Sequence, residues 1–413
     1  MTGPRERLKP RRRREDRNRR VRAWAVCVGT GGVAGLLLWL LVGGAAGAAL
    51  GAAAMLGGLG VGHSFMIAPP GVPILTYHSV SPDASWLPWA DEISVHPETL
   101  RQHLAAMRRM GCGIVSTRAL VAARRGGAAL PERPVVLHFD DGYLDNWIYA
   151  APILREAGAA ATFFASLDFI ASGEAPRRAD CADTSGYMNW AELAALDGEP
   201  LFDVEPHGID HGRVAVSERV VGTLNEANWR SLAWVQWARM PGPKHDWYRH
   251  TAPPAVPIGS PVPESEGALA APALGESKAE YHARVAEHLG RSMEALEAKL
   301  GRRPEIFCWP ENRVSVAARE IATGAGYAAT TAGEGRNTAA EPAHILSRIH
   351  AGDRALGFRF APAERLHIRA VIGLFEGNHY WYLVSGPMSL VRRLVSVSAR
   401  HIRKSRRHAS VAR

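Results

Sequence analysis

The chain of 413 residues has few cysteines, no surplus of acid and no basic stretch in its central part. Its four cysteines, Cys27, Cys112, Cys181 and Cys308, include no C-x-x-C pair, which argues against a zinc finger or a disulfide scaffold. The net charge of +9 by itself would suit a nucleic-acid-binding protein. However, residues 1–22 hold eleven Lys or Arg against three acids, and residues 389–413 hold eight against none. The two ends therefore sum to +16 and the remainder to about −7, so we expect no nucleic-acid partner.

Charge is also absent from the forty residues between Ala23 and Gly62. A helix of roughly 20 apolar residues crosses the hydrocarbon core of a bilayer, which is about 30 Å thick. The first half of the stretch is strongly apolar and the second half is mostly Gly and Ala, so we expect one transmembrane helix with a weakly apolar extension over residues 23–68. A cleaved signal peptide is disfavoured, because its apolar region spans only ~7–15 residues.

The charges that flank this stretch predict its orientation in the membrane. The Arg-rich residues 1–22 form a basic cytoplasmic tail by the positive-inside rule, which places the rest of a single-pass chain outside the cytoplasm. The alternative is a hairpin of two spans that turns at Gly43-Gly44 and returns the body of the chain to the cytoplasm. In either arrangement, we expect the protein in the cell membrane.

Strand and helix patterns alternate in the region that follows. Short apolar runs at residues 72–78, 135–139 and 161–165 predict strands, and the spacing of apolar residues in 99–110 predicts a helix. Such alternation is typical of an α/β fold with a parallel sheet or barrel, in which chemistry gathers at the carboxyl ends of strands. We place the corresponding domain at residues 69–350.

Two further segments depart from this pattern. Residues 213–275 hold four tryptophans and a Pro-rich run, so we expect an insertion that forms a long loop or lid. Residues 351–413 are predicted to form a C-terminal extension that ends in a basic amphipathic helix. Its apolar side, at Leu390, Leu394 and Val397, would suit contact with a membrane surface.

A set of acids and histidines provides the chemistry. Asp140 and Asp141 follow an apolar strand, and His207 and His211 are four residues apart, as in many metal sites. Two imidazoles and one carboxylate are typical of catalytic zinc, although cobalt, nickel or iron would accept the same ligands. Such a metal activates water and polarises a carbonyl, while a second carboxylate takes a proton and another histidine protonates the departing amine. Solvated acids at a turn and an incidental histidine pair are the alternative interpretation.

These residues resemble motifs of a known family. His138-Phe139-Asp140-Asp141-Gly142-Tyr143 resembles the first motif of the polysaccharide deacetylases, and His207-x-x-x-His211 resembles the second. Leu75-x-Tyr77-His78-Ser79 and Phe307-Cys308-Trp309-Pro310 are similar to the opening and third motifs of the poly-N-acetylglucosamine deacetylase branch. The resemblance covers about residues 72–350.

The resemblance implies a distorted (β/α) barrel of about seven parallel strands that removes N-acetyl groups from an N-acetylated glycan. It implies roles for Asp140 as general base, His78 as acid, and Asp141, His207 and His211 as ligands of a divalent metal, with zinc our first choice. It also implies substrate contacts for Trp309, Pro310, Tyr143 and Arg313, with a core aromatic residue as the alternative for Trp309 and a solvated side chain as the alternative for Arg313. For Arg313 we also consider a role in orienting Asp140. The insertion's tryptophans would either stack on sugar rings or form the core of the lid.

Departures from the family pattern leave the substrate open. His138 replaces a Thr, Gly208 replaces the Ser or Thr of the ligand loop, and Glu311-Asn312 replaces the end of the third motif. One alternative is a deacylase or deformylase of a lipid-linked sugar at the membrane surface. Another is a non-catalytic glycan-binding protein on the same fold.

Overall fold

The computed structural model describes residues 8–411, and the side chains of residues 15–397. The outermost parts of both predicted basic ends lie outside these described residues. Contacts within the chain define two compact units. One comprises residues 72–353, and the other joins residues 1–71 to residues 354–413. Each unit is described separately below.

A parallel sheet of six strands forms one half of the larger unit. Its order is β13 (Ile349–His350), β1 (Ile74–Tyr77), β5 (Pro134–Phe139), β6 (Ala161–Ala165) and β7 (Phe202–Pro206), and β4 (Gly113–Ile114) also pairs with β5. Every residue of β1 and β6 is buried, which explains why these strands are continuous apolar runs rather than alternating ones. The strands predicted at residues 72–78, 135–139 and 161–165 are confirmed.

A second parallel sheet contains β10 (Ile306–Phe307), β11 (Ala329–Gly333) and β12 (Ile345–Ser347). Cys308 donates its backbone N–H to the carbonyl of Pro206 at 3.0 Å, at the boundary between the two sheets. Across the other boundary the chain passes directly from β12 through Arg348 to β13. The parallel α/β fold agrees with the prediction, whereas closure into a single barrel is not confirmed, because the strands pair as separate ladders. Pro206 has no N–H to extend pairing at this edge, and β10 is only two residues long.

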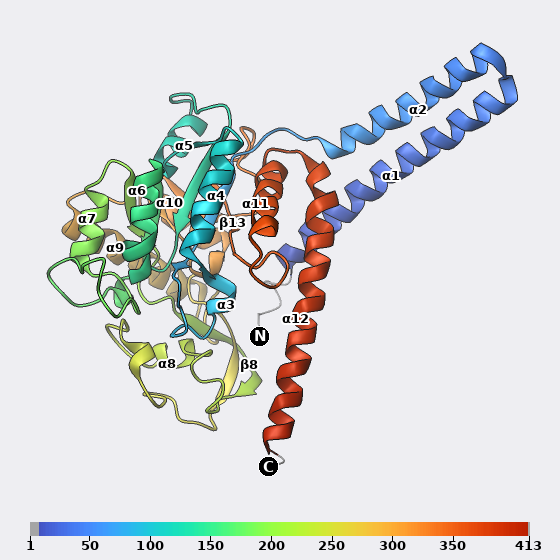
Figure 1. Cartoon of the computed structure of the whole chain (residues 1–413). Helices are drawn as coiled ribbons and strands as arrows, with labels where there is room; N and C mark the ends of the chain where they lie inside the picture. Colours follow the sequence, from blue (N-terminus) through green and yellow to red (C-terminus); the bar gives the residue numbers. More distant parts are fainter. Residues whose placement is uncertain (1–7, 412–413) are drawn as a thin grey trace. The chain divides into compact units, whose positions relative to one another are not determined.

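Helices connect and cover these strands (Figure 1). They are α4 (Pro97–Arg109), α5 (Thr117–Arg124), α6 (Ala151–Ala157) after the π turn η1 (Asn146–Ala150), α7 (Trp190–Asp197), α9 (Lys278–Leu300) and α10 (Val316–Gly324). Shorter elements are α3 (Ala90–Ile93), the paired β2 (Ser79–Val80) and β3 (Ser94–Val95), η2 (Leu167–Phe169) and η4 (Pro310–Asn312). Helix α9 has well-defined ends, because Ser277 and Glu280 form a capping box and Gly301 ends the helix at a φ of 71°.

The predicted insertion is a folded hairpin rather than an open loop. Strands β8 (Arg213–Thr223) and β9 (Pro261–Gly267) pair antiparallel, with α8 (Trp234–Trp237) and η3 (Trp247–Arg249) between them. Trp229, Trp237 and Trp247 are buried. Trp229 packs with Leu224 and Val262 of the insertion, whereas Trp237 and Trp247 pack with Phe169 of the main fold. These three indoles are therefore used in packing, which is one of the two alternatives that we considered for the tryptophans of the insertion.

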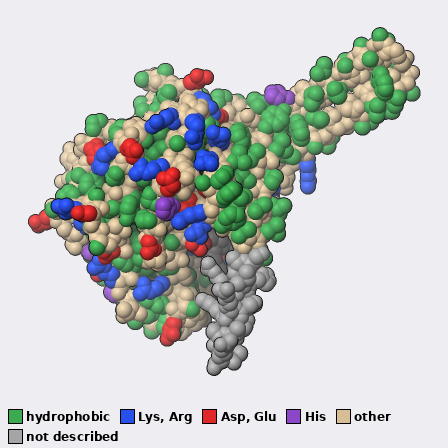
Figure 2. All heavy atoms as spheres, viewed as in Figure 1, with side chains coloured by type: hydrophobic (Ala, Val, Ile, Leu, Met, Phe, Trp, Pro, Cys, Tyr) green, Lys and Arg blue, Asp and Glu red, His purple; other side chains and the backbone are tan. Residues whose placement is uncertain are grey.

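The smaller unit begins with two long helices, α1 (Leu8–Val42) and α2 (Gly44–Met66). They run antiparallel (Figure 1) and turn at Gly43 and Gly44, whose φ values of 69° and 56° suit glycine. Both are long and apolar enough to cross a membrane. On the face seen in Figure 2 the outer part of this hairpin shows only uncharged side chains. The extension that we expected to follow a single span is therefore a second helix.

The hairpin is associated with the C-terminal helices of the same unit, α11 (Ala361–Phe375), η5 (His379–Trp381) and α12 (Tyr382–Val411). Ile67 forms a β-bridge with Asn378, and Ala68 donates its N–H to the carbonyl of Gly377 at 3.0 Å. The predicted apolar side of α12, at Leu390, Leu394 and Val397, is exposed. The four cysteines, all within the described residues, are free thiols.

Candidate active site

Four of the predicted site residues lie at the carboxyl ends of neighbouring strands. His78 follows β1, Asp140 and Asp141 follow β5, and His207 follows β7. Because parallel strands end at the same edge of a sheet, residues separated by more than 120 positions in the sequence meet there.

Asp141, His207 and His211 form a compact group of potential metal ligands. Their ligand atoms lie within 4.8 Å of one another. Asp141 Oδ1 is 3.2 Å from His207 Nε2 and 3.8 Å from His211 Nε2. The group is only partly buried, so a substrate can approach it. Two imidazole nitrogens and one carboxylate oxygen in this arrangement fit a divalent cation such as zinc.

The backbone around His207 fixes its tautomer. His207 Nδ1 lies 3.0 Å from the backbone carbonyl of Cys308, which can only accept a hydrogen bond. A proton therefore resides on Nδ1, so Nε2, which faces Asp141, is the nitrogen that a cation would use. A carbonyl that orients a histidine in this way is a common outer partner of metal-ligating imidazoles.

Two of the three candidate ligands adopt strained backbone conformations. Asp141 has a φ of 73° and His211 a φ of 48°, a region that residues with a Cβ rarely enter. Such strain costs about 1–3 kcal/mol per residue and is concentrated at functional sites. The strain at Asp141 and His211 therefore supports a functional role for this group.

Asp140 lies beside this group and is paired with a buried arginine. Arg348 Nη1 donates to Asp140 Oδ1 at 2.7 Å, and both side chains are almost completely buried. Burial alone would raise the pKa of Asp140, but the positive charges of Arg348, His207 and His78 hold that pKa at about 2. Asp140 is therefore ionised at neutral pH. Its second oxygen, Oδ2, is left to interact with water.

A second set of potential ligands, Asp140, His207 and Cys308, overlaps the first and is completely buried. The guanidinium of Arg348 occupies one oxygen of Asp140, so a cation there would meet a positive charge. The Asp141, His207 and His211 group is therefore the better candidate.

The predicted acid, His78, faces the same carboxylate. Its Nε2 is 3.9 Å from Asp140 Oδ2, and its side chain is partly exposed. Burial lowers the pKa of His78, an effect that the charges of Asp141 and Asp140 partly oppose. The structure thus places an imidazole near the reacting carboxylates.

Aromatic residues line one side of Asp141. Tyr143 is buried, with its ring centroid 5.3 Å from that of Tyr187 and 5.7 Å from that of Trp86. Burial and the nearby charge of Asp141 raise the pKa of Tyr143, so its hydroxyl stays protonated. Trp86 remains partly exposed and is the more accessible member of this cluster.

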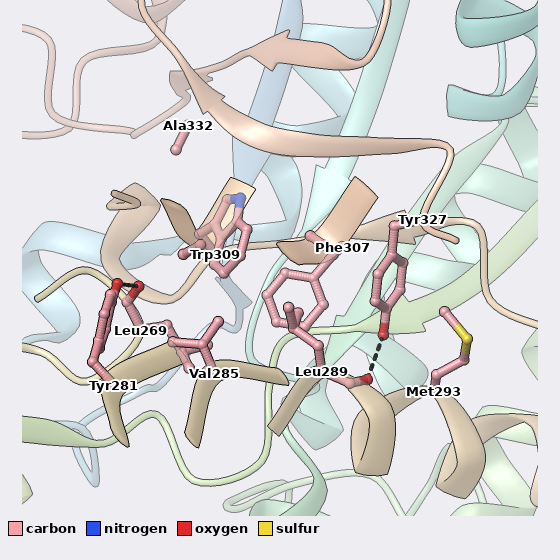
Figure 3. Packing of buried hydrophobic residues seen from close by; sticks show 11 residues of the cluster. Leu269, Tyr281, Val285, Leu289, Met293, Phe307, Trp309, Tyr327 and Ala332 are labelled. Atoms are coloured by element: carbon pink, nitrogen blue, oxygen red, sulfur yellow. Dashed lines mark hydrogen bonds between the residues drawn. The ribbon is translucent and has the colours of Figure 1, made fainter. Parts of the chain in front are cut away.

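Three predicted substrate contacts lie elsewhere than expected. Trp309 is fully buried in the core beside α9, where its ring lies 4.7 Å from that of Phe307 (Figure 3), so it cannot wall a sugar pocket. Pro310 is also buried, and its ring lies close to Gly208. Arg313 pairs with Glu266 of β9 at 2.5 Å, so it attaches the insertion and is not the arginine that holds Asp140.

The substituted motif residue His138 also points away from the site. Its Nε2 lies 2.9 Å from Thr117 Oγ1 in the interior of the unit. His138 therefore contributes to the interior packing of the unit rather than to the candidate metal group.

Arg348 and His288 are site residues that the sequence did not indicate. Arg348 is 208 positions from Asp140, and His288 of α9 accepts the backbone N–H of Ile209 at 2.7 Å. Neither belongs to a motif. For Arg348 the sequence offered one signal, a cationic residue at the end of a strand. For His288 it offered none.

A cavity of about 480 Å³ adjoins the loop that carries the histidines. Ile209 and Asp210 of the loop line it, together with Trp237 and Met240 of the insertion and Arg291 of α9. The insertion thus forms one wall of this cavity.

The chain is similar to several known proteins. Residues 127–330 match the family model described as polysaccharide deacetylase. The chain is 26% identical over 262 residues to poly-beta-1,6-N-acetyl-D-glucosamine N-deacetylase of Escherichia coli strain K12, and to the protein of the same name in strain O157:H7. The match covers 62% of this chain but 33% of each relative, so the chain spans about a third of the length of the curated relatives it matches.

Among solved structures, the chain matches a de-N-acetylase from Aggregatibacter actinomycetemcomitans. The match has 21% identity and a TM-score of 0.48, and it covers 67% of this chain and 94% of that one. The deacetylase domain of BpsB from Bordetella bronchiseptica shows 19% identity, a TM-score of 0.48 and coverage of 69% and 97%.

Proposed function

Because residues 127–330 form a polysaccharide deacetylase domain, we propose that this chain is a metal-dependent hydrolase that removes N-acetyl groups from an N-acetylhexosamine-containing glycan. The observation that most supports this proposal is that a group of potential metal ligands lies next to a candidate general base. A compact Asp141, His207 and His211 group lies beside a buried Asp140 that Arg348 keeps ionised.

Each residue then has a distinct task. Asp141, His207 and His211 would hold the cation, with zinc our first choice and cobalt, nickel or iron as alternatives. When bound, the cation would polarise the amide carbonyl and make water more acidic. Asp140 accepts the proton of the attacking water through Oδ2, since Arg348 occupies Oδ1. His78, whose Nε2 is 3.9 Å from that oxygen, passes this proton on to the departing amine, so that the proton taken from water ends on the product.

Release of acetate tests this function. The purified full chain is incubated with acetylated glucosamine oligomers, with and without a chelator, and acetate and bound metal are measured. We expect acetate release that the chelator abolishes and that added zinc restores. Release that is insensitive to the chelator would contradict metal dependence, and no release from any acetylated glycan would favour the non-catalytic glycan-binding alternative.

The paired helices α1 and α2 favour a second candidate substrate. Their ends lie together, since Arg20 Nη1 donates to the carbonyl of Phe65 at 3.0 Å. If both helices cross the bilayer, the catalytic unit follows on the same side as the Arg-rich tail, which the positive-inside rule assigns to the cytoplasm. Because α1 and α2 are paired in this way, we propose that the chain crosses the membrane twice, as a hairpin, rather than once. A lipid-linked sugar at the cytoplasmic membrane surface would then be the substrate, deacylated or deformylated by the same residues.

A competition between substrates separates the two candidates. The protein in native membranes is given soluble acetylated oligomers and lipid-linked acetylated or formylated sugars, and products are identified by mass spectrometry. Preference for the lipid-linked sugars would support the second candidate, whereas equal processing of soluble oligomers would count against it.

A further inference from the structure

The loop from His207 to His211 is held from two opposite directions. On one side, the carbonyls of Gly208 and Ile209 accept the backbone N–H groups of Leu167 and Asp168 at 3.1 and 2.8 Å. On the other side, Ile209 donates its own N–H to His288 Nε2 at 2.7 Å. The first set of bonds comes from the segment after β6, and the second comes from the middle of α9.

His288 is suited to accept this hydrogen bond. Burial lowers the pKa of His288 to about 4, so the imidazole is neutral at neutral pH and Nε2 offers a lone pair. Ile209 is almost completely buried, which leaves its N–H little access to water. A buried N–H without an acceptor destabilises the fold, because the donor has lost its water and gained no partner.

Gly208 and His288 occupy complementary space. Gly208 has a φ of 83°, and a Cβ placed there would lie 2.8 Å from His288 Nε2 and 3.5 Å from Pro310. The imidazole therefore fills the volume that any larger residue at position 208 would need. This contact explains why the sequence has glycine between two histidines that must be held in place.

We infer that His288 is a positioning residue that locks the loop between His207 and His211 and so preorganises the candidate metal ligands. This inference rests on the proposed function, because it concerns the same metal group. His211 adopts a φ of 48°, a strained conformation that persists only where the surrounding structure enforces it. Loss of an outer-shell partner typically lowers metal affinity 10- to 100-fold.

The test compares two substitutions of His288 in the full chain purified in detergent. His288→Leu removes the acceptor, and His288→Gln keeps an acceptor of similar reach. His282→Leu is the matched control, because His282 lies on the same helix and contacts Tyr281 instead. Zinc affinity is measured by competition with a chromophoric chelator. Hydrogen exchange over residues 205–212 is measured in the metal-free protein.

We expect His288→Leu to weaken zinc binding 10- to 100-fold and to accelerate exchange of the Ile209 amide. His288→Gln should stay within threefold of the native affinity, and His282→Leu should match the native protein. His288→Asn, which is too short to reach Ile209, repeats the comparison if the leucine variant does not fold.

The inference is overturned if the variants without an acceptor only lower the melting temperature while affinity and exchange match the native protein. Failure of the native chain to bind any divalent metal would instead contradict the proposed function. Even in that case, the comparison of hydrogen exchange between the native and variant chains would show whether His288 holds the loop.

Discussion

At the scale of single residues, Arg348 is the partner that keeps the candidate base charged and oriented. It is bonded to Asp140 at 2.7 Å and contacts Asn312 at 3.4 Å. Replacement by Met leaves a buried carboxylate without its partner, a change that typically costs 3–5 kcal/mol when a buried pair is broken. In the proposed mechanism the role of Arg348 is positioning, since Asp140 and not Arg348 would accept the proton of the attacking water.

We predict that Arg348→Met lowers kcat about 100-fold with little change in KM or zinc affinity, because it disturbs the base and spares the ligands. Arg348→Lys should restore part of kcat. Arg155→Met, which removes an ion pair with Glu199 on the surface of the same unit, is the control. Steady-state kinetics and zinc titration provide the measurement. An equal loss of zinc affinity would show that Arg348 acts on the whole site.

Asp140 itself gives the strictest test of the mechanism. Asp140→Asn keeps the shape of the side chain but cannot accept a proton, so we predict a loss of 10²–10⁴ in kcat. Zinc binding should persist, because Asp140 is outside the proposed ligand set. Acetate release assayed alongside bound zinc checks this result, and substantial activity in the zinc-loaded variant would remove Asp140 from the role of base.

Asp145 provides a prediction for stability rather than activity. It is buried and accepts hydrogen bonds from Ser79 Oγ at 2.6 Å and Val80 N at 3.1 Å, next to His78. Burial raises the pKa of Asp145 to about 7. Between about pH 4 and pH 7 the unfolded carboxyl is ionised while the folded one is protonated, so stability falls as pH rises, by at most about 1.4 kcal/mol per pH unit.

Replacement of Asp145 by Asn should remove that part of the pH dependence. The amide keeps an oxygen that can accept from Ser79 and has no proton to lose near pH 7. Thermal melting of both proteins at pH 5.5 and 7.5 is the measurement, and the difference in melting temperature between the two pH values should be larger for the native chain. Identical differences would show that Asp145 is ionised throughout.

The sequence predicted site residues where the signal was local. Asp140 and Asp141 follow a short apolar strand, and His207 was indicated by its spacing of four residues from His211. Arg348 and His288 were missed because their partners are 208 and 79 positions away. The expectation for Trp309 was wrong because its burial depends on how α9 packs over β10, which no local pattern reveals.

At the scale of elements, the short buried strands could be predicted from the sequence, but whether they close into a barrel could not. Apolar runs identify β1, β5 and β6, but ladder continuity between β7 and β10 depends on one hydrogen bond at Pro206. Similarly, the forty uncharged residues led us to expect one span with a weakly apolar extension, with a hairpin of two spans as the alternative. The features that decide between them are Gly43 and Gly44, which adopt positive φ, and glycines spaced along both helices.

The close approach of α1 and α2 predicts which glycines matter. A Cβ at Gly35 would lie 2.6 Å from the carbonyl oxygen of Gly51, whereas a Cβ at Gly32 meets nothing within 4 Å. We predict that Gly35→Val destabilises the hairpin by about 1–3 kcal/mol through overpacking, while Gly32→Val has little effect. Thermal melting and protease resistance of the two helices in detergent are the measurements. Equal behaviour of the two variants would contradict the close packing.

At the scale of the whole molecule, the hairpin decides which compartment holds the catalytic unit. Residues 23–42 and 44–62 are each about as long as a bilayer span, and both lack charged side chains. The Arg-rich residues 11–22 precede the first helix, and five residues separate the end of α2 from the start of the catalytic unit at Val72. A two-span hairpin therefore predicts a cytoplasmic active site and a single span predicts an external one.

Reporter fusions distinguish these two arrangements. A phosphatase that is active only outside the cytoplasm, and a fluorescent protein that folds only inside it, are joined after residue 43 or after residue 70. Both arrangements predict an active phosphatase after residue 43, which serves as the control for insertion of α1. After residue 70 the hairpin predicts fluorescence without phosphatase activity, because α2 returns the chain across the bilayer. Phosphatase activity at that position would restore the single span and, with it, a glycan substrate outside the membrane.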